Sequence, residues 1–201
     1  IDLGDKKART AKEVEQVLEY SVENIARQHN ISLSSNMYHL KFAQLIQTLS
    51  SKGKVVVLID EYDKPILGNV ENPQVHEIKE ALKGFYSVIK SADQYLRFVF
   101  MTGVSKFSKV SVFSDLNNLY DITMDPAYAT MLGYTQEELE NYFSEHIQTL
   151  AQKEGTSKQE MLSDIRTWYN GYRFSRKDEK VYNPVSVMNL FKTNEFRNYW
   201  F

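Results

Sequence analysis

The stretch VVVLIDEYD, residues 55–63, constrains the fold of this chain more than any other feature of the sequence. Its five consecutive apolar residues, four of them β-branched, are typical of a β-strand. The run does not alternate with polar residues, and a strand that is apolar at every position is typical of a parallel sheet covered on both faces. Asp60, Glu61 and Asp63 then follow within four positions. The sequence therefore predicts an α/β fold in which carboxylates end a buried strand.

Amphipathic helices flank this strand in the sequence. A capping-box pair, Thr10 and Glu13, predicts the start of one helix, a second is expected from Met37 to about Ser50, and Asn72-Pro73 opens a third. The residues expected to face inward are Val14, Val17, Leu18, Val22 and Ile25, then Met37, Leu40, Leu45, Ile46 and Leu49, then Val75, Ile78, Leu82, Phe85 and Ile89. A second apolar strand, YLRFVFMTG, follows at 95–103. Alternating helices and buried strands indicate the α/β class.

The pattern becomes mainly helical after about Asp125. Capping boxes at Thr135/Glu138 and Ser157/Glu160 predict two helices, GYRFSRKDEKVYNP at 171–184 indicates a hairpin, and Asn183-Pro184 begins a last short helix. Inward positions are expected at Leu139, Tyr142, Phe143, Ile147 and Leu150, and at Met161, Ile165 and Trp168. We therefore expect two parts, a core over residues 1–126 and a helical subdomain over residues 127–201.

Composition excludes several classes of protein. The 201 residues include 24 basic and 26 acidic ones and no cysteine, so thiol catalysis, disulfides and Cys-ligated zinc are ruled out. A net charge of −2 gives no support for nucleic-acid binding. The longest apolar run, residues 55–59, is far shorter than the ~20 residues of a membrane span. We expect a cytoplasmic protein without a membrane partner.

The acids at the end of the first strand have the pattern of a phosphoryl-transfer site. Ligands of open parallel sheets bind beyond the carboxyl ends of the strands. An apolar strand that ends in Asp-Glu is the Walker B pattern, in which Asp60 would serve Mg²⁺ and Glu61 would orient the attacking water. Thr102 ends the neighbouring strand and is expected to sense the γ-phosphate, while Lys106 adds positive charge. The alternative is a strand that stops in a charged, solvated turn.

Several ordered motifs resemble one known family. The motifs VVVLIDEYDKPI, FVFMTGVSKFSKVSVFSDLNNLYDIT, LGYTQEEL, WYNGYRFS and VYNPVSVMNLF resemble, in order and spacing, the bacterial AAA-ATPase-like proteins over nearly the whole chain. The resemblance implies part of a P-loop NTPase sheet followed by a helical lid. It also implies ATP and Mg²⁺ as cofactors, Asp60 as the Mg²⁺-associated residue, Glu61 as the catalytic glutamate, and Thr102 as the sensor.

One part of that family pattern is missing from the sequence. No G-x-x-x-x-G-K-[ST] loop occurs, because Val55 follows the only Gly-Lys pair, Gly53-Lys54. We expect that a preceding segment supplies this Walker A loop and that the fragment alone is inactive. A vestigial interaction module is the alternative. Family members often carry a C-terminal nuclease-like domain, which leaves the regulator of a nuclease as a third interpretation. Glu77-Ile78-Lys79 resembles a nuclease motif but lies in an amphipathic helix, as a solvated face would.

Overall fold

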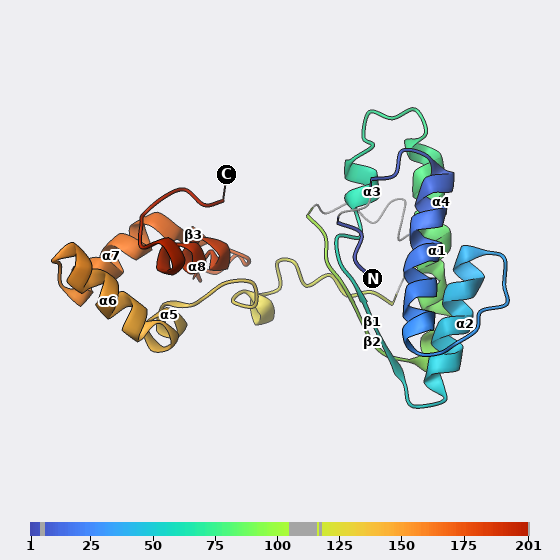
Figure 1. Ribbon diagram of the computed structural model, residues 1–201, viewed down its shortest axis with the longest axis horizontal. Helices are drawn as coiled ribbons and strands as arrows, with labels where there is room; N and C mark the ends of the chain where they lie inside the picture. The colour runs from blue at the N-terminus through green and yellow to red at the C-terminus, as the bar shows by residue number, and fades with distance from the viewer. Residues whose placement is uncertain (5–6, 105–115, 117, 201) are drawn as a thin grey trace. The chain divides into compact units, whose positions relative to one another are not determined.

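The computed structural model describes residues 1–4, 7–104, 116 and 118–200. The chain forms two compact units, residues 1–119 and residues 120–201, and each is described by itself (Figure 1). Helices and a small parallel sheet make up the first unit, so the α/β class is confirmed.

Two parallel strands form the sheet of the first unit. Strand β1 (Val55–Ile59) pairs with β2 (Leu96–Met101), and Ile59 lies opposite Met101 at the carboxyl ends. The first residues of the chain continue this pattern on the other side of β1. Asp60 donates its N–H to the carbonyl of Ile1 at 2.9 Å, and Asp2 and Asp60 form a parallel bridge. β1 is therefore flanked by parallel backbone on both edges.

Helices cover one face of this sheet. Helix α1 (Ala11–Gln28), α2 (Tyr38–Ser50) and α4 (Val75–Ser91) pack together beside β1 and β2 (Figure 1). The Thr10 hydroxyl caps α1 by accepting the N–H of Glu13. Two short helices, α3 (Lys64–Leu67) and η1 (Asp93–Tyr95), lie in the connections around α4. The core of this unit includes Val14, Leu18, Val22, Phe42, Leu45, Ile46, Val57, Ile59, Ile78, Leu82, Phe85 and Ile89.

The inward face of α2 differs from the prediction. Met37 and Leu40 are exposed, while Phe42 is buried and stacks on Phe85 of α4 with ring centroids 4.4 Å apart. Met37 precedes the first turn of α2 as its N-cap residue. The aromatic contact with α4 therefore sets the buried stripe of this helix, and two exposed apolar residues were wrongly placed inside it.

The second face of the sheet is exposed in the described part of the chain. Val56 and Leu58 of β1 are 51% and 56% exposed, and Phe98 of β2 is 53% exposed. The Phe98 ring stacks on that of Phe100 on this same face. Among the described residues no helix covers this face, so helices on both faces of the intact sheet stay a prediction. An apolar sheet surface is left open.

The second unit is built mainly from helices. It contains η2 (Pro126–Tyr128), α5 (Gln136–Tyr142), α6 (Ser144–Glu154), α7 (Lys158–Tyr169) and α8 (Pro184–Thr193). Strands β3 (Asn170–Tyr172) and β4 (Val181–Tyr182) form the expected hairpin, and Tyr134 joins β4 through an antiparallel bridge to Tyr182. Both predicted capping boxes are present, at α5 and at α7, and the Asn183 side chain caps α8.

Two inward positions of this unit were predicted wrongly. The expected single helix breaks at Phe143 into α5 and α6, which changes the phase of the helical stripe and leaves Tyr142 72% exposed. Trp168 is 52% exposed, because the adjacent Tyr169 takes the buried place on α7. Phe143 is half-buried, and the other predicted positions, Leu139, Ile147, Leu150, Met161 and Ile165, are buried.

None of the helices in the described ranges combines the length and apolar character needed to cross a membrane.

Candidate functional site

Asp60 and Thr102 meet where the two parallel strands end. The β1–β2 ladder continues one step past both strands, because Thr102 donates its N–H to Ile59 and accepts the N–H of Tyr62, both at 2.9 Å. This ladder brings the Thr102 hydroxyl to Oδ1 of Asp60, to which it donates a hydrogen bond. The N–H of Glu61 binds the same oxygen at 3.0 Å. The two residues that the sequence predicted at neighbouring strand ends are therefore in direct contact.

Glu61 turns away from Asp60 toward the first residues of the chain. Its backbone has a φ of 51°, a left-handed conformation that side chains other than glycine adopt at a cost. Its carboxylate lies over Gly4, whose Cα would place an ideal Cβ 3.1 Å from Cδ of Glu61. Oε2 of Glu61 lies 3.3 Å from Nζ of Lys64 but makes no hydrogen bond there. Strained backbone of this kind is concentrated at functional sites.

Asp63, the third acid, has a buried side chain. Its carboxylate accepts the N–H of Val104 at 3.2 Å and so connects the end of β1 to the turn after β2. Tyr86 of α4 lies close by and donates its hydroxyl to the carbonyl of Tyr62 at 2.9 Å. Burial, and then the nearby charge of Asp63, raise the pKa of Tyr86 well above its usual value. The sequence suggested only a turn at Asp63, although an acid two positions before Pro65 was the available signal for an ordered helix start.

Gly103 allows the chain to pass closely over this turn. An ideal Cβ at Gly103 would lie 2.8 Å from Oδ1 of Asp63 and 2.4 Å from Cε1 of the Tyr62 ring. Only glycine fits this approach without a shift of its neighbours. The sequence predicted only that Gly103 ends the strand at 95–103.

The donor chemistry at the strand ends suits Mg²⁺. Asp60 and Thr102 offer carboxylate and hydroxyl oxygens, the ligands that Mg²⁺ prefers, and Mg²⁺ usually takes only one or two protein oxygens beside water and phosphate. In the ranges that the structure describes, no group of three or more His, Asp or Glu side chains forms a self-contained metal site. The fourth predicted site residue, Lys106, lies outside the described residues, and so does Ser105.

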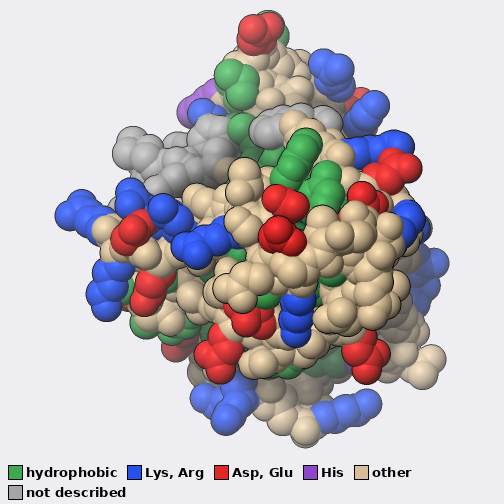
Figure 2. All heavy atoms as spheres, turned by 90° about the vertical axis from the view of Figure 1, so that its left-hand side faces the viewer, with side chains coloured by type: hydrophobic (Ala, Val, Ile, Leu, Met, Phe, Trp, Pro, Cys, Tyr) green, Lys and Arg blue, Asp and Glu red, His purple; other side chains and the backbone are tan. Residues whose placement is uncertain are grey.

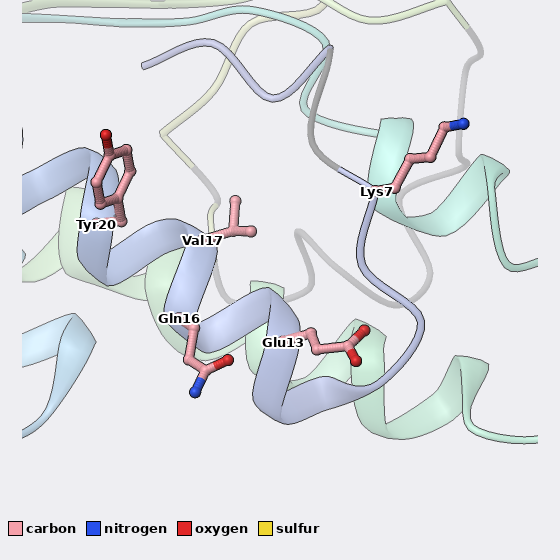
Figure 3. Close-up of a pocket in the computed structure, with 5 residues that line it drawn as sticks. All are labelled: Lys7, Glu13, Gln16, Val17 and Tyr20. Atoms are coloured by element: carbon pink, nitrogen blue, oxygen red, sulfur yellow. The ribbon is translucent and has the colours of Figure 1, made fainter.

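A shallow pocket occurs elsewhere on the first unit. Figure 3 shows four side chains from α1 and one from the segment before it around a pocket of about 380 Å³. Its lining residues are Lys7, Glu13, Gln16, Val17 and Tyr20. Asp60, Glu61 and Thr102 do not line it. This pocket therefore adds nothing to the site at the strand ends.

The described residues form no large patch of one charge on the face that Figure 2 shows. Acidic and basic side chains are interspersed over the face shown in Figure 2. Glu77 is exposed on the outside of α4 while Ile78 is fully buried, as the solvated-face interpretation of Glu77-Ile78-Lys79 requires. The described surface thus leaves the strand ends as the best candidate site.

Comparison with known proteins defines the class to which this chain belongs. Residues 1–113, more than half of the chain, match the AAA-ATPase-like family, whose description is "Predicted AAA-ATPase". The chain is a member of the AAA-ATPase-like family, as the motifs indicated. Asp60, Glu61, Asp63 and Thr102 all lie in the matched region.

A curated relative extends the similarity into the second unit. It is an Azotobacter chroococcum mcd 1 protein named "Uncharacterized protein in vnfD 5'region", 45% identical to this chain over 164 residues. The match covers 80% of this chain and 30% of the relative, so the chain spans about a third of that protein. No solved structure matches the chain.

Proposed function

We propose that this chain is the Walker B and sensor half of an ATP-binding and ATP-hydrolysing domain that works as a nucleotide-driven switch. The main support for this proposal is the hydrogen bond between Thr102 and Asp60 at the carboxyl ends of adjacent parallel strands. This edge is where open α/β sheets bind their ligands. Family membership supports a nucleotide-related function in general.

Asp60, Thr102 and Glu61 would have separate roles, because the Glu61 side chain points away from the other two. Asp60 and Thr102 would hold the Mg²⁺-bound end of the triphosphate, and bound Mg²⁺ would neutralise phosphate charge. Glu61 would accept a proton from the attacking water or orient it. In the structure Oε2 of its carboxylate is buried beside Lys64, so Glu61 has to leave that ion pair to act.

The open sheet face supports a further strand and helix in the intact domain. The connections from residues 1–3 to β1 and from β1 to β2 cross the sheet in the same direction, which places α1, α2 and α4 on one face. A helix on the other face needs a connection that crosses in the opposite direction. We propose that a preceding strand pairs with the outer edge of β2, and that its helix covers Val56, Leu58 and Phe98. The phosphate-binding loop would lie between that strand and helix.

An extended form of the protein tests this function. With Mg-ATP at 100 times its Kd, ligand binding adds about 2.7 kcal/mol to the free energy of unfolding. We expect a rise in thermal midpoint for the extended form and none for the 201-residue chain. Glu61→Gln should lower ATP hydrolysis about 10²- to 10⁴-fold while the rise in midpoint persists.

The exposed Glu71 supplies the control, since Glu71→Gln removes the same charge outside the site and should leave hydrolysis unchanged. An extended form whose midpoint does not respond to Mg-ATP would contradict the proposal and favour the vestigial interaction module.

A further inference from the structure

We propose that Asp63 is a positioning residue of this site, which holds the turn after β2 so that Thr102 stays against Asp60. The inference rests on the proposed function. It assigns a role to the third acid of the DEYD sequence, which is fully buried and accepts a hydrogen bond from the turn after β2.

The side chain of Asp63 acts on β2 rather than on its own helix. Asp63 is the N-cap residue of α3, where an aspartate normally accepts an N–H of the first turn. Here no such side-chain bond is made, and the backbone carbonyl of Asp63 makes only the ordinary first bonds of the helix, to the N–H groups of Ile66 and Leu67 at 2.9 Å. The carboxylate instead accepts the N–H of Val104. Its bond therefore fixes the residue two positions beyond Thr102.

Thr102 is held from both sides by this arrangement. The N–H and the carbonyl of Thr102 bind Ile59 and Tyr62, and these two hydrogen bonds fix its backbone. After it, Gly103 packs directly on Asp63 and the Tyr62 ring, and Val104 is bound by Asp63. The Tyr86 hydroxyl donates a hydrogen bond to the carbonyl of Tyr62 and so holds the residue before Asp63. Loss of the Asp63 bond would free the far side of Thr102, and its hydroxyl would be less firmly directed at Asp60.

The burial of Asp63 shows that its contacts compensate for desolvation. A carboxylate with no solvent exposure destabilises a fold unless donors surround it. A helix cap could be made by an exposed aspartate at lower cost. The buried position is explained if the turn after β2 must be fixed within a fraction of an ångström, as catalytic groups require.

The test compares Asp63→Ala with Asp63→Asn in the extended, ATP-hydrolysing form. Alanine removes the acceptor for Val104, whereas asparagine keeps its shape and an oxygen that accepts this N–H. We expect Asp63→Ala to lower kcat about tenfold to a hundredfold with the KM for ATP within about twofold. Asp63→Asn should restore most of kcat. Rates are referred to folded protein, measured from the thermal transition of each variant.

Gly103→Ala provides an independent route to the same displacement, because the added Cβ pushes on Asp63 and Tyr62. If the two residues act on one turn, the double variant Asp63→Ala/Gly103→Ala should lose little more kcat than the worse single variant. Additive losses would overturn the inference, and so would an Asp63→Ala variant that loses thermal stability but keeps wild-type kcat. Absence of hydrolysis in the wild type, matched by its Glu61→Gln variant, would instead overturn the proposed function itself.

Discussion

Lys41 shows at the scale of one residue how the helical layer of the first unit is held. Its ammonium lies 2.6 Å from Glu19 and also binds Glu23, so that one side chain of α2 contacts two glutamates on successive turns of α1. The Lys41 side chain is only 12% exposed. Two glutamates at i and i+4 repel each other, and Lys41 offsets that repulsion. The hydrogen bonds to both glutamates raise the pKa of Lys41 above its usual value.

We predict that Lys41→Met lowers the free energy of unfolding by about 1 kcal/mol, because it leaves the two glutamates without their shared cation. Urea unfolding followed by circular dichroism measures the change. Lys52 is exposed in the turn after α2, so Lys52→Met is the matched control and should be close to neutral.

The pH dependence of this interaction follows from the raised pKa. The stabilisation is fully present below the unfolded pKa of 10.5 and is lost as pH rises through the higher folded pKa. The difference in stability between wild type and Lys41→Met should therefore shrink in the alkaline range above pH 10.5. A difference that stays constant there would show that Lys41 stabilises by packing alone.

At the scale of elements, the second unit depends on a close approach between the LGYT segment and β4. Tyr134 and Tyr182 exchange backbone hydrogen bonds at 3.2 and 2.8 Å. Gly133 makes this possible, because an ideal Cβ there would lie 2.7 Å from the carbonyl oxygen of Tyr182 and would overlap Val181. Tyr134 and Tyr182, 48 positions apart in the chain, can thus pair because residue 133 is glycine.

Gly133→Ala should lower the free energy of unfolding of the second unit by about 1–3 kcal/mol, since the methyl group meets backbone that cannot yield easily. Trp168 and Trp200 are the two tryptophans of the chain and both lie in this unit, so fluorescence follows its unfolding selectively. Ser163→Ala, at an exposed position of α7 in the same unit, is the control and should be close to neutral. Equal transitions for both variants would argue against a close contact at Gly133.

The sequence predicted the type and order of most elements because their signals are local. Thr135 with Glu138 and Ser157 with Glu160 form the expected capping boxes, since these bonds join residues three positions apart. The contact between Asp60 and Thr102 was also predictable, because parallel strands bring their carboxyl ends to one edge. Long-range packing was not. Phe42 is buried by its ring contact with Phe85, 43 positions away, and periodicity alone placed Leu40 there instead.

The buried role of Asp63 escaped prediction for the same reason. Its partner, Val104, lies on another strand exit, 41 positions along the chain. Nothing in the local sequence DEYDKP distinguishes a solvated turn from a turn that another strand covers.

At the scale of the whole molecule, the open apolar face of the β1–β2 sheet is the dominant feature. Val56, Leu58 and Phe98 lie exposed on the face opposite the helices. Parallel sheets are normally covered on both faces, so we expect another segment of the protein or a second molecule to cover this surface. Its behaviour should therefore differ between the 201-residue chain and an extended form.

We predict that Leu58→Lys reduces self-association and binding of an apolar dye in the 201-residue chain, while its free energy of unfolding changes by less than about 0.5 kcal/mol. In the extended form the same change should cost about 2 kcal/mol or more, because the lysine would then be buried without a partner. Light scattering and thermal unfolding measure the two effects. Val70 is similarly exposed and lies outside the sheet, so Val70→Lys is the control. If Leu58→Lys changes the stability of both forms equally, no further segment covers Leu58.

The left-handed backbone at Glu61 has a consequence for how this protein can change. A glutamate at a φ of 51° costs the fold about 1–2 kcal/mol that a glycine would not. Variants selected for heat resistance alone would drift toward glycine at position 61 and would lose the carboxylate in the same step. If Glu61 orients the attacking water as proposed, stability and hydrolysis place opposite demands on this position, and a stabilised variant with glycine there would hydrolyse ATP more slowly.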